Sequence, residues 1–553
     1  MHDADAAAVQ PTHRAVGRSP RWLAWTGLSL ALLPCAGFLA VELYLLGGHL
    51  GLPLDDGWIH LQFARNLASG HGLAYNPDHR VAGSTAPLWT ALLSIGLLVR
   101  LPAVAWAQAL GVAAQLLTVA GSWRLARALT LPRPLAALAA GLVATSGPLV
   151  WGALSGMEIP AFTALSVWAM AYHARERVAL SPGTPAPLSL LLLGLAVLLR
   201  PEGLLLLALA LGDRLLVLRR EGDELRLTCP PWRSLLTGAL LAGLLVLPVV
   251  LVYQALGGSP LPTTFDTKAG YSTPGLPRAQ YLFGVLGLLA AAQPVAALLA
   301  PAGALALLAR LGGDADRGLL PALWAGGLPL AYGVLSGTGR GILGNFGRYF
   351  FPLLPVVAVL AVLAVAPLLG RLPPRLRWGP LVVAWPLWLG ALLLLPGLAS
   401  LLAGAGRYAQ NLRDVEAGDV RLAHLLALRL DARASLAVDD IGALKYLLPN
   451  PVVDLAGIVT PEVHAYAHRA LAATGSYCPG LLAFVRDRRP DYLAIFPRRH
   501  ECFDDSEFPP LLRLEVPDNI TLGEDTIVLH ATPWTRYPLG PAPPSGSAAA
   551  SRP

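Results

Sequence analysis

Charged side chains are scarce in this sequence. Only 14% of its 553 residues are Asp, Glu, Lys or Arg, 55% are hydrophobic, and the mean hydropathy is +0.56. Ordinary soluble proteins carry about 25% charged residues. The apolar residues form blocks that carry almost no charge until about residue 403, after which charged residues return at normal density. One soluble globule and a disordered chain are therefore excluded, and a polytopic membrane protein with an extramembrane C-terminal domain is indicated.

Lysine and cysteine are also rare. Four cysteines exclude a disulfide scaffold, although Cys478 and Cys502 in the C-terminal region could pair in an oxidising compartment or remain free thiols. Walker, HExxH and paired CxxC motifs are absent from the sequence, and no GxGxxG follows an expected strand. A nucleotide-driven pump and a zinc hydrolase are therefore unsupported. The net charge of +7 calls for no nucleic acid partner, because the basic residues cluster in short loops that we expect to be cytoplasmic.

The arginines set the expected orientation. A basic leader precedes the first apolar run, which we interpret as a signal anchor with its N-terminus in the cytoplasm. About eleven spans then satisfy the positive-inside rule, provided that 87–99 lies in the interface or re-enters instead of crossing. The expected parts are a cytoplasmic leader (1–21), a transmembrane domain (22–403) with its first outer loop at 49–86, an extracytoplasmic domain (404–537) and a disordered tail (538–553).

Short apolar runs alternate with helical stretches in the region 404–537. This alternation predicts a small α/β domain. The expected strands are 435–438, 452–455, 492–496, 511–514 and 526–529.

The first outer loop carries two adjacent acids, Asp55 and Asp56, soon after a membrane span. Apolar residues recur at helical spacing over 57–68, which predicts an amphipathic helix lying in the membrane interface. Adjacent carboxylates at the bilayer edge are costly unless they are paired or bound, so they could supply a catalytic base or cap the helix. His60 stands one helical turn from Asp56, which suits a metal ligand or a solvated interface side chain.

Three further ionisable residues interrupt apolar stretches. Arg200 and Glu202 lie between two short spans, and Glu158 lies in the segment SGMEIP. Ionisable groups at membrane depth are functional candidates and normally have a partner. For Arg200 and Glu202, the alternative is that they pair with each other across the intervening proline.

Two outer segments add cationic candidates. Lys268 is the only lysine outside the C-terminal domain and could bind a phosphate or simply be solvated. Arg348 and Tyr349 lie at the outer end of the following span, where ligand binding and anchoring at the interface explain them about equally.

In their order along the chain, these motifs resemble those of the GT-C superfamily of integral-membrane glycosyltransferases. The closer resemblance is to the bacterial arabinofuranosyltransferase-like branch, whose first-loop motif corresponds to Asp55 through Trp89. In the loop that ends at Lys268, Thr263 stands where the family usually has Asn. The other matching segments are SGME (155–158), RPEG (200–203), the loop 261–268, RYFFPLLP (348–355) and DIGALKY with VVDLAG (440–457).

The resemblance implies an all-α GT-C-like membrane protein with a C-terminal α/β domain. It would transfer a sugar from a polyprenyl-phosphate donor to a cell-envelope acceptor outside the cell membrane. Asp55, slightly favoured over Asp56, would be the general base. The resemblance allows a divalent metal without requiring one. The donor phosphate would be held by Arg200, Lys268, Arg348 and Arg65, in that order, with Glu202, Tyr349, Glu158 and His60 as further substrate-binding residues.

Two other functions fit part of the pattern. A transporter or flippase of lipid-linked saccharides would also need a basic pocket at the bilayer edge, and a non-catalytic relative could still bind polyprenyl lipid. The acidic pair separates these alternatives from an enzyme, because a flippase has no use for a general base at one face only.

Overall fold

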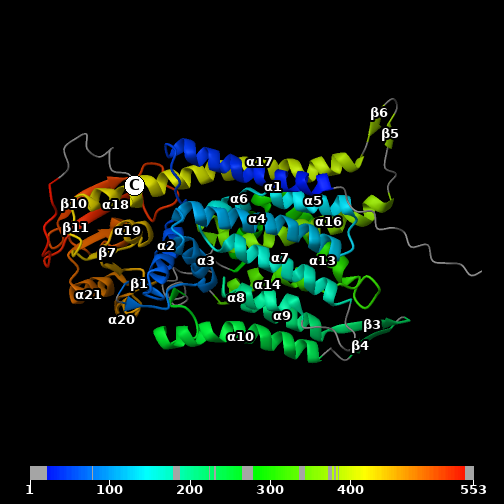
Figure 1. The fold of residues 1–553 in the computed structure, drawn as a ribbon, viewed down its shortest axis with the longest axis horizontal. Helices are drawn as coiled ribbons and strands as arrows, with labels where there is room; N and C mark the ends of the chain where they lie inside the picture. Colours follow the sequence, from blue (N-terminus) through cyan, green and yellow to red (C-terminus); the bar gives the residue numbers. More distant parts are fainter. Residues whose placement is uncertain are drawn as a thin grey trace, which may run out of the picture.

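The computed structural model describes residues 21–77, 79–178, 187–222, 224–228, 232–264, 278–335, 343–371, 376–378, 381–383 and 385–541. The helices lie side by side along the long axis of the molecule, and a sheet-containing domain caps one end of the bundle (Figure 1). Two short hairpins, β3–β4 (Val217–Glu221 and Glu224–Thr228) and β5–β6 (Leu376–Trp378 and Leu381–Val383), lie at the other end.

The bundle is built from apolar helices of very different lengths. Within the described residues, four helices are long and apolar enough to cross a membrane, or up to six if each of two bent pairs is one span. The expected number of about eleven spans therefore stays a prediction. The bundle helices are α1 (Arg21–Leu45), α3 (Pro87–Leu98), α4 (Ala103–Ala128), α5 (Arg133–Ala144), α6 (Gly147–Leu154), α7 (Ile159–Glu176), α8 (Leu188–Val197), α9 (Gly203–Leu215), α10 (Trp232–Gly257), α12 (Arg278–Ala292), α13 (Pro294–Leu308), α14 (Leu320–Leu335), α16 (Leu354–Arg371) and α17 (Trp385–Val415).

Small residues let neighbouring helices approach closely. A Cβ added to Gly303 of α13 would lie 2.0 Å from the carbonyl oxygen of Leu360 in α16, and one added to Gly111 of α4 would lie 1.9 Å from that of Ala153. In a bilayer, where lipid is as apolar as leucine, this close backbone packing is a main source of helix association.

The C-terminal domain is an α/β unit around a five-stranded sheet of order β10-β11-β9-β7-β8. Its middle strand β9 pairs in parallel with β7 and antiparallel with β11. Cys478 and Cys502 form a disulfide in this domain. The five expected strands are confirmed as β7 (Leu436–Val438), β8 (Val452–Asp454), β9 (Tyr492–Ile495), β10 (Pro510–Glu515) and β11 (Thr526–Ala531). The domain's helices are α19 (Gly442–Leu447), α20 (Val463–Thr474) and α21 (Cys478–Arg488).

The last bundle helix continues into the C-terminal domain. From α17 the chain passes through a π-helical turn, η2 (Glu416–Val420), into α18 (Arg421–Ala427), so that one 38-residue helix runs from Gly390 to Ala427. The expected domain boundary at 403–404 falls inside this helix, so the bundle and the domain share a rigid element.

The first outer loop forms helix α2 (Asp55–Ala68), followed by the small β1–β2 ladder (Ala74–Asn76 and His79–Arg80). The helix itself was expected, and its expected place in the membrane interface stays a prediction. Nine of its fourteen residues are buried, and it packs against both α3 and α19. It therefore lies between the bundle and the C-terminal domain.

The close approach of α13 and α16 leads to a first prediction. Gly303→Ala forces two backbones apart, so we expect it to lower the thermal unfolding midpoint of the purified protein, with a cost of about 1–3 kcal/mol. The control is Gly243→Ala on α10, where no described atom lies within 4 Å of the added Cβ. Its midpoint should stay or rise, because alanine favours a helix more than glycine. Equal midpoints for the two variants would contradict the packing described here.

Candidate active site

A cavity of about 390 Å³ lies where the bundle meets the first outer loop and the C-terminal domain. Its wall comes from α2, the turn after α6, the turn between α8 and α9, helix α14, the short helix η1 (Asn345–Leu353) and Ile458 of the C-terminal domain. The described lining contains three carboxylates and two guanidinium groups among mostly apolar side chains. The side chains with acid–base or hydrogen-bonding groups at the centre of this wall are Asp56, His60, Glu158, Arg200, Glu202, Tyr332, Arg348 and Tyr349.

Asp56 and Arg348 form an ion pair on this wall. The Asp56 Oδ2 atom lies 2.7 Å from Nη1 of Arg348, whose side chain is only 6% exposed, whereas that of Asp56 is 37% exposed. Arg348 also lies 5.5 Å from the ring centre of Tyr349. A buried guanidinium needs such partners, and the open side of Asp56 leaves its carboxylate accessible from the cavity.

The η1 segment that carries Arg348 has an unusual backbone. Phe346 and Gly347 both adopt the left-handed region, with φ of +63° and +68°. A bulky residue at positive φ is disfavoured and persists only where the surroundings hold it. The two left-handed residues turn the chain just before Arg348 and Tyr349, which line the cavity.

Arg200 is the centre of a second ionic cluster. Its guanidinium lies 2.6 Å from Glu158 and 2.7 Å from Glu202. His60 Nε2 lies 3.0 Å from the other oxygen of Glu158, and the hydroxyl of Tyr332 donates a hydrogen bond to Glu202. The pairing of Arg200 with Glu202, which the sequence left open as an alternative, is present. It is one contact of a network that joins α2, the turn before α7, the α8–α9 turn and α14.

The turn that carries Glu158 is packed tightly against α2 and α3. Gly156 has φ of +74°, and its carbonyl oxygen accepts a hydrogen bond of 2.9 Å from the indole of Trp89. A Cβ added to Gly57 of α2 would lie 2.6 Å from the carbonyl oxygen of Ser155. The glycines therefore let the turn and α2 come close enough for His60 to reach Glu158.

Asp55 points away from this cavity. Its two carboxylate oxygens accept hydrogen bonds of 2.6 and 2.7 Å from the backbone N–H groups of Gly442 and Ala443, at the start of α19. It is absent from the described residues that line the cavity. The sequence left a helix cap and a base as alternatives for the acidic pair. In this structure Asp55 caps a helix of another domain, and Asp56 is the member of the acidic pair that lines the cavity.

Of the two other candidate cations, the structure describes only Arg65. Arg65 donates hydrogen bonds to the carbonyl oxygens of Tyr446 (2.7 Å) and Lys445 (3.3 Å) and lies over the Tyr446 ring. It therefore joins α2 to the C-terminal domain and is absent from the described cavity lining, which corrects its expected place at the donor phosphate. Lys268 lies outside the described residues. Thr263, which stands where the family has Asn, donates its hydroxyl hydrogen to the carbonyl oxygen of Ile458 (2.7 Å).

Sequence reasoning did not single out Tyr332. The only signal was a tyrosine near the end of an otherwise apolar helix, which is also the pattern of an interface anchor. Its contact with Glu202 arises from packing between helices distant in sequence. Among the residues that the structure describes, no group of three or more His, Cys, Asp or Glu side chains is placed to hold a metal ion.

Comparisons with known proteins give one family model and several solved structures of similar fold. A family model described as a domain of unknown function (DUF8728) matches residues 406–537. No curated protein sequence matches the chain. The structure is similar to apo ArnT from Cupriavidus metallidurans, with a TM-score of 0.58, 16% identity, and coverage of 93% of this chain and 98% of that one. The structure of ArnT bound to undecaprenyl phosphate gives a TM-score of 0.55 at the same identity and coverage.

A second solved protein shares the architecture. The apo oligosaccharyltransferase of Archaeoglobus fulgidus has a TM-score of 0.53 at 13% identity, with 86% of this chain and 70% of that chain covered. At such identities the likeness is one of fold. The resemblance to GT-C membrane glycosyltransferases is confirmed at that level. The chain is a membrane protein with this fold and a small sheet domain.

Buried acidic residues at the junction of α2 and the C-terminal domain should make the stability of the protein depend on pH. Burial raises the pKa of Asp55 to about 6, with the charges of Asp56 and Asp454 adding to it against the two N–H donors. Burial likewise raises the pKa of Asp454 to about 6. Burial, with the charges of Asp55 and Asp439, raises the pKa of Asp440 well above its ordinary value.

Since these folded-state pKa values lie above the ordinary carboxyl value of about 4, the folded state binds more protons in this range. Stability is then highest below about pH 4 for these groups and is lost as pH rises through about 6. We expect the thermal midpoint to rise between about pH 7.5 and pH 5, and Asp440→Asn to reduce this slope. Asp431→Asn is the control, because Asp431 is partly exposed and its pKa of about 2 leaves it ionised throughout. A midpoint that falls on acidification would contradict this assignment.

Proposed function

We propose that this protein is a membrane glycosyltransferase that transfers a sugar from a polyprenyl-phosphate donor to an acceptor outside the membrane. The observation that carries the proposal is the Asp56–Arg348 ion pair on the wall of one cavity, beside the cluster around Arg200. A carboxylate and guanidinium groups are what this transfer needs at its two reacting ends. The fold shared with ArnT, one structure of which is bound to undecaprenyl phosphate, supports this substrate class.

In the proposed reaction, the bond between the anomeric carbon and the carrier phosphate breaks, and the phosphate leaves with the electron pair. The acceptor oxygen forms the new bond to the anomeric carbon, and its proton passes to Asp56. An acceptor hydroxyl is a poor nucleophile, so removal of its proton by a positioned carboxylate accelerates attack. Asp56 suits this role because its carboxylate is partly open to the cavity, whereas that of Asp55 is occupied by two backbone donors.

Charge compensation favours Arg348 and Arg200 as the groups that face the leaving phosphate. Positioned cations stabilise the charge that develops as such a bond breaks. In the described structure each guanidinium is balanced by carboxylates: Arg348 by Asp56, and Arg200 by Glu158 and Glu202. A donor phosphate that draws Arg348 to itself would weaken its pairing with Asp56 and leave that carboxylate more basic. Donor binding would therefore prepare the base for the acceptor.

The location of the cavity suits a substrate with a lipid tail and a polar head. It lies where the helix bundle meets the C-terminal domain, so an isoprenoid chain can stay among apolar helices while its head group reaches the ionic wall. We place this end of the molecule outside the cytoplasm. The Cys478–Cys502 disulfide supports that side, because disulfides persist in oxidising compartments. The acceptor on this side would be a cell-envelope glycan, lipid or protein.

The two neighbouring acids provide a matched test. We expect Asp56→Asn to reduce the release of polyprenyl phosphate from a panel of polyprenyl-phosphate sugars by about 10²–10⁴-fold, because the general base is lost. Asp55→Asn keeps one of the two acceptor oxygens and leaves one backbone N–H of α19 unpaired, so it should lower stability by about 1–3 kcal/mol while turnover persists. Turnover and unfolding are measured on both variants in lipid nanodiscs. Full turnover in Asp56→Asn would overturn this role. Donor transport across liposomes with no release would indicate a flippase.

Arg348 gives a second test of the same site. In Arg348→Gln we expect turnover to fall by about 10²–10³-fold, because one cation at the leaving phosphate is removed. This variant also leaves Asp56 without its partner, so the double variant Arg348→Gln with Asp56→Asn is examined alongside it. The double variant should unfold near the wild-type temperature and bind the donor weakly. Wild-type donor binding in both would show that Arg348 does not contact the phosphate.

A further inference from the structure

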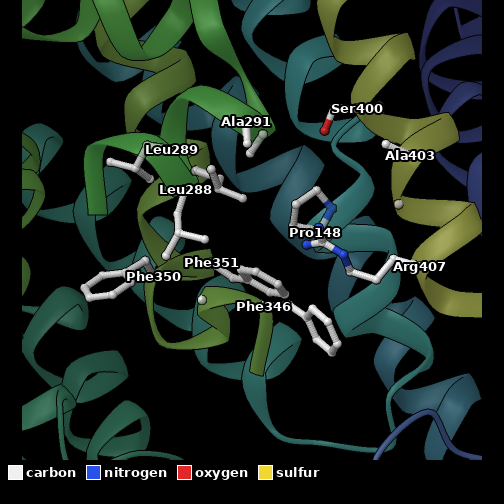
Figure 2. Close-up of a pocket in the computed structure, with 14 residues that line it drawn as sticks. Pro148, Leu288, Leu289, Ala291, Phe346, Phe350, Phe351, Ser400, Ala403 and Arg407 are labelled. Atoms are coloured by element: carbon white, nitrogen blue, oxygen red, sulfur yellow. The ribbon is translucent and has the colours of Figure 1, made fainter. Parts of the chain in front are cut away.

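A second, smaller cavity of about 120 Å³ lies on the other side of η1. Figure 2 shows its lining, which is almost entirely apolar and comes from α6, α12, η1, α16 and α17. Within η1, Phe346, Gly347, Phe350 and Phe351 line this cavity, whereas Arg348 and Tyr349 line the one that holds Asp56. The same short segment therefore separates an apolar slot from the ionic site.

The slot opens to the outside of the bundle between α12 and α17. Ala291 and Ala403, one from each helix, line it and are exposed. The two helices also expose large apolar side chains: Phe283 is 73% exposed on α12 and Leu402 is 75% exposed on α17. In a membrane protein, exposed side chains of this kind face the hydrocarbon of the bilayer. The mouth of the slot therefore faces lipid.

One charged residue, Arg407, stands at the slot. Its side chain extends from α17 toward Phe346 and Pro148 (Figure 2), and its guanidinium lies 5.0 Å from the centre of the Phe346 ring. Arg407 is exposed, and no carboxylate of the described residues pairs with it. A cation beside a lipid-facing apolar surface is a functional candidate, and its natural charged partner is an anion.

We propose that this slot binds an anionic phospholipid of the surrounding bilayer. One hydrocarbon chain enters between α12 and α17 against Phe346 and Phe350, and the phosphate pairs with Arg407. An apolar slot with one cation at its mouth matches the two parts of such a lipid. Basic pockets between transmembrane helices on the cytoplasmic side of membranes bind lipid head groups through the same pairing of cation and phosphate. This site is separate from the proposed transfer site and does not depend on the protein being a glycosyltransferase.

A phospholipid fits better here than the proposed sugar donor. The slot has about a third of the volume of the cavity that holds Asp56. The described lining of the slot contains no carboxylate, and the backbone of η1 stands between it and Asp56. A sugar bound at the slot would therefore lie away from the acids and from Arg200, whereas a phosphate with an acyl chain needs only what the slot provides.

The test uses the purified full-length protein, stripped of lipid in a neutral detergent and titrated with phosphatidylglycerol or phosphatidylcholine. Bound lipid is counted by native mass spectrometry. We expect one tight phosphatidylglycerol site and weaker binding of phosphatidylcholine. Arg407→Gln should bind phosphatidylglycerol roughly fivefold more weakly, the effect of one arginine near an anionic lipid. Ala403→Phe should block the slot and remove the tight site.

Matched controls lie on the same helix. Arg413→Gln removes an exposed arginine outside the slot, and Leu402→Phe enlarges an exposed side chain beside it, so both should bind phosphatidylglycerol like the wild type. Asp56→Asn should do so too, which separates this site from the proposed transfer site. The proposal is overturned if Arg407→Gln and Arg413→Gln weaken binding equally, if Ala403→Phe keeps the tight site, or if phosphatidylcholine binds equally well. It is also overturned if undecaprenyl phosphate displaces phosphatidylglycerol from this site at lower concentration.

Discussion

The cap that Asp55 provides for α19 fixes the geometry on which the candidate site depends. The contact joins residues 387 positions apart, and it holds α2 against the C-terminal domain. Successive residues of a helix point about 100° apart, so holding Asp55 toward α19 turns Asp56 toward the cavity. Two identical side chains next to each other in sequence therefore meet different surroundings. The carboxylate of Asp55 accepts two backbone N–H donors, and that of Asp56 faces Arg348 and the cavity.

In the described structure each ion on the cavity wall has an oppositely charged partner, and for all of them except Glu202 one such partner comes from another element. Arg200 joins Glu158 to Glu202, and Arg348 reaches Asp56 on α2. Desolvated charges are stable only when they are paired in good geometry, so these contacts hold α2, the turns and η1 together at the end of the bundle. The same pairs balance the guanidiniums until an anionic substrate competes for them. The same ion pairs would then stabilise the empty site and hold the guanidinium groups in place for a phosphate.

Features that depend on local sequence patterns could be predicted from the sequence. The contacts of individual side chains with distant parts of the chain could not. Short apolar runs between helical stretches predicted all five strands of the C-terminal sheet, and ionisable residues in apolar stretches identified Glu158, Arg200 and Glu202. The division of work between Asp55 and Asp56 could not be predicted, because the donors to Asp55 belong to a distant helix. Arg65 was misplaced for the same reason: its acceptors are carbonyl oxygens of α19, which no motif specifies.

Because one unbroken helix runs from Gly390 to Ala427, its number of residues sets both the distance and the rotation angle between the bundle and the C-terminal domain. Adding or removing one residue in its middle would rotate everything beyond it by about 100° and shift it by about 1.5 Å. The backbone N–H of Gly442 would then face away from Asp55, although the sequences of the bundle and of the domain were unchanged. A chimera that takes this domain from a related sequence should therefore keep the length of the helix, or change it only by whole helical turns.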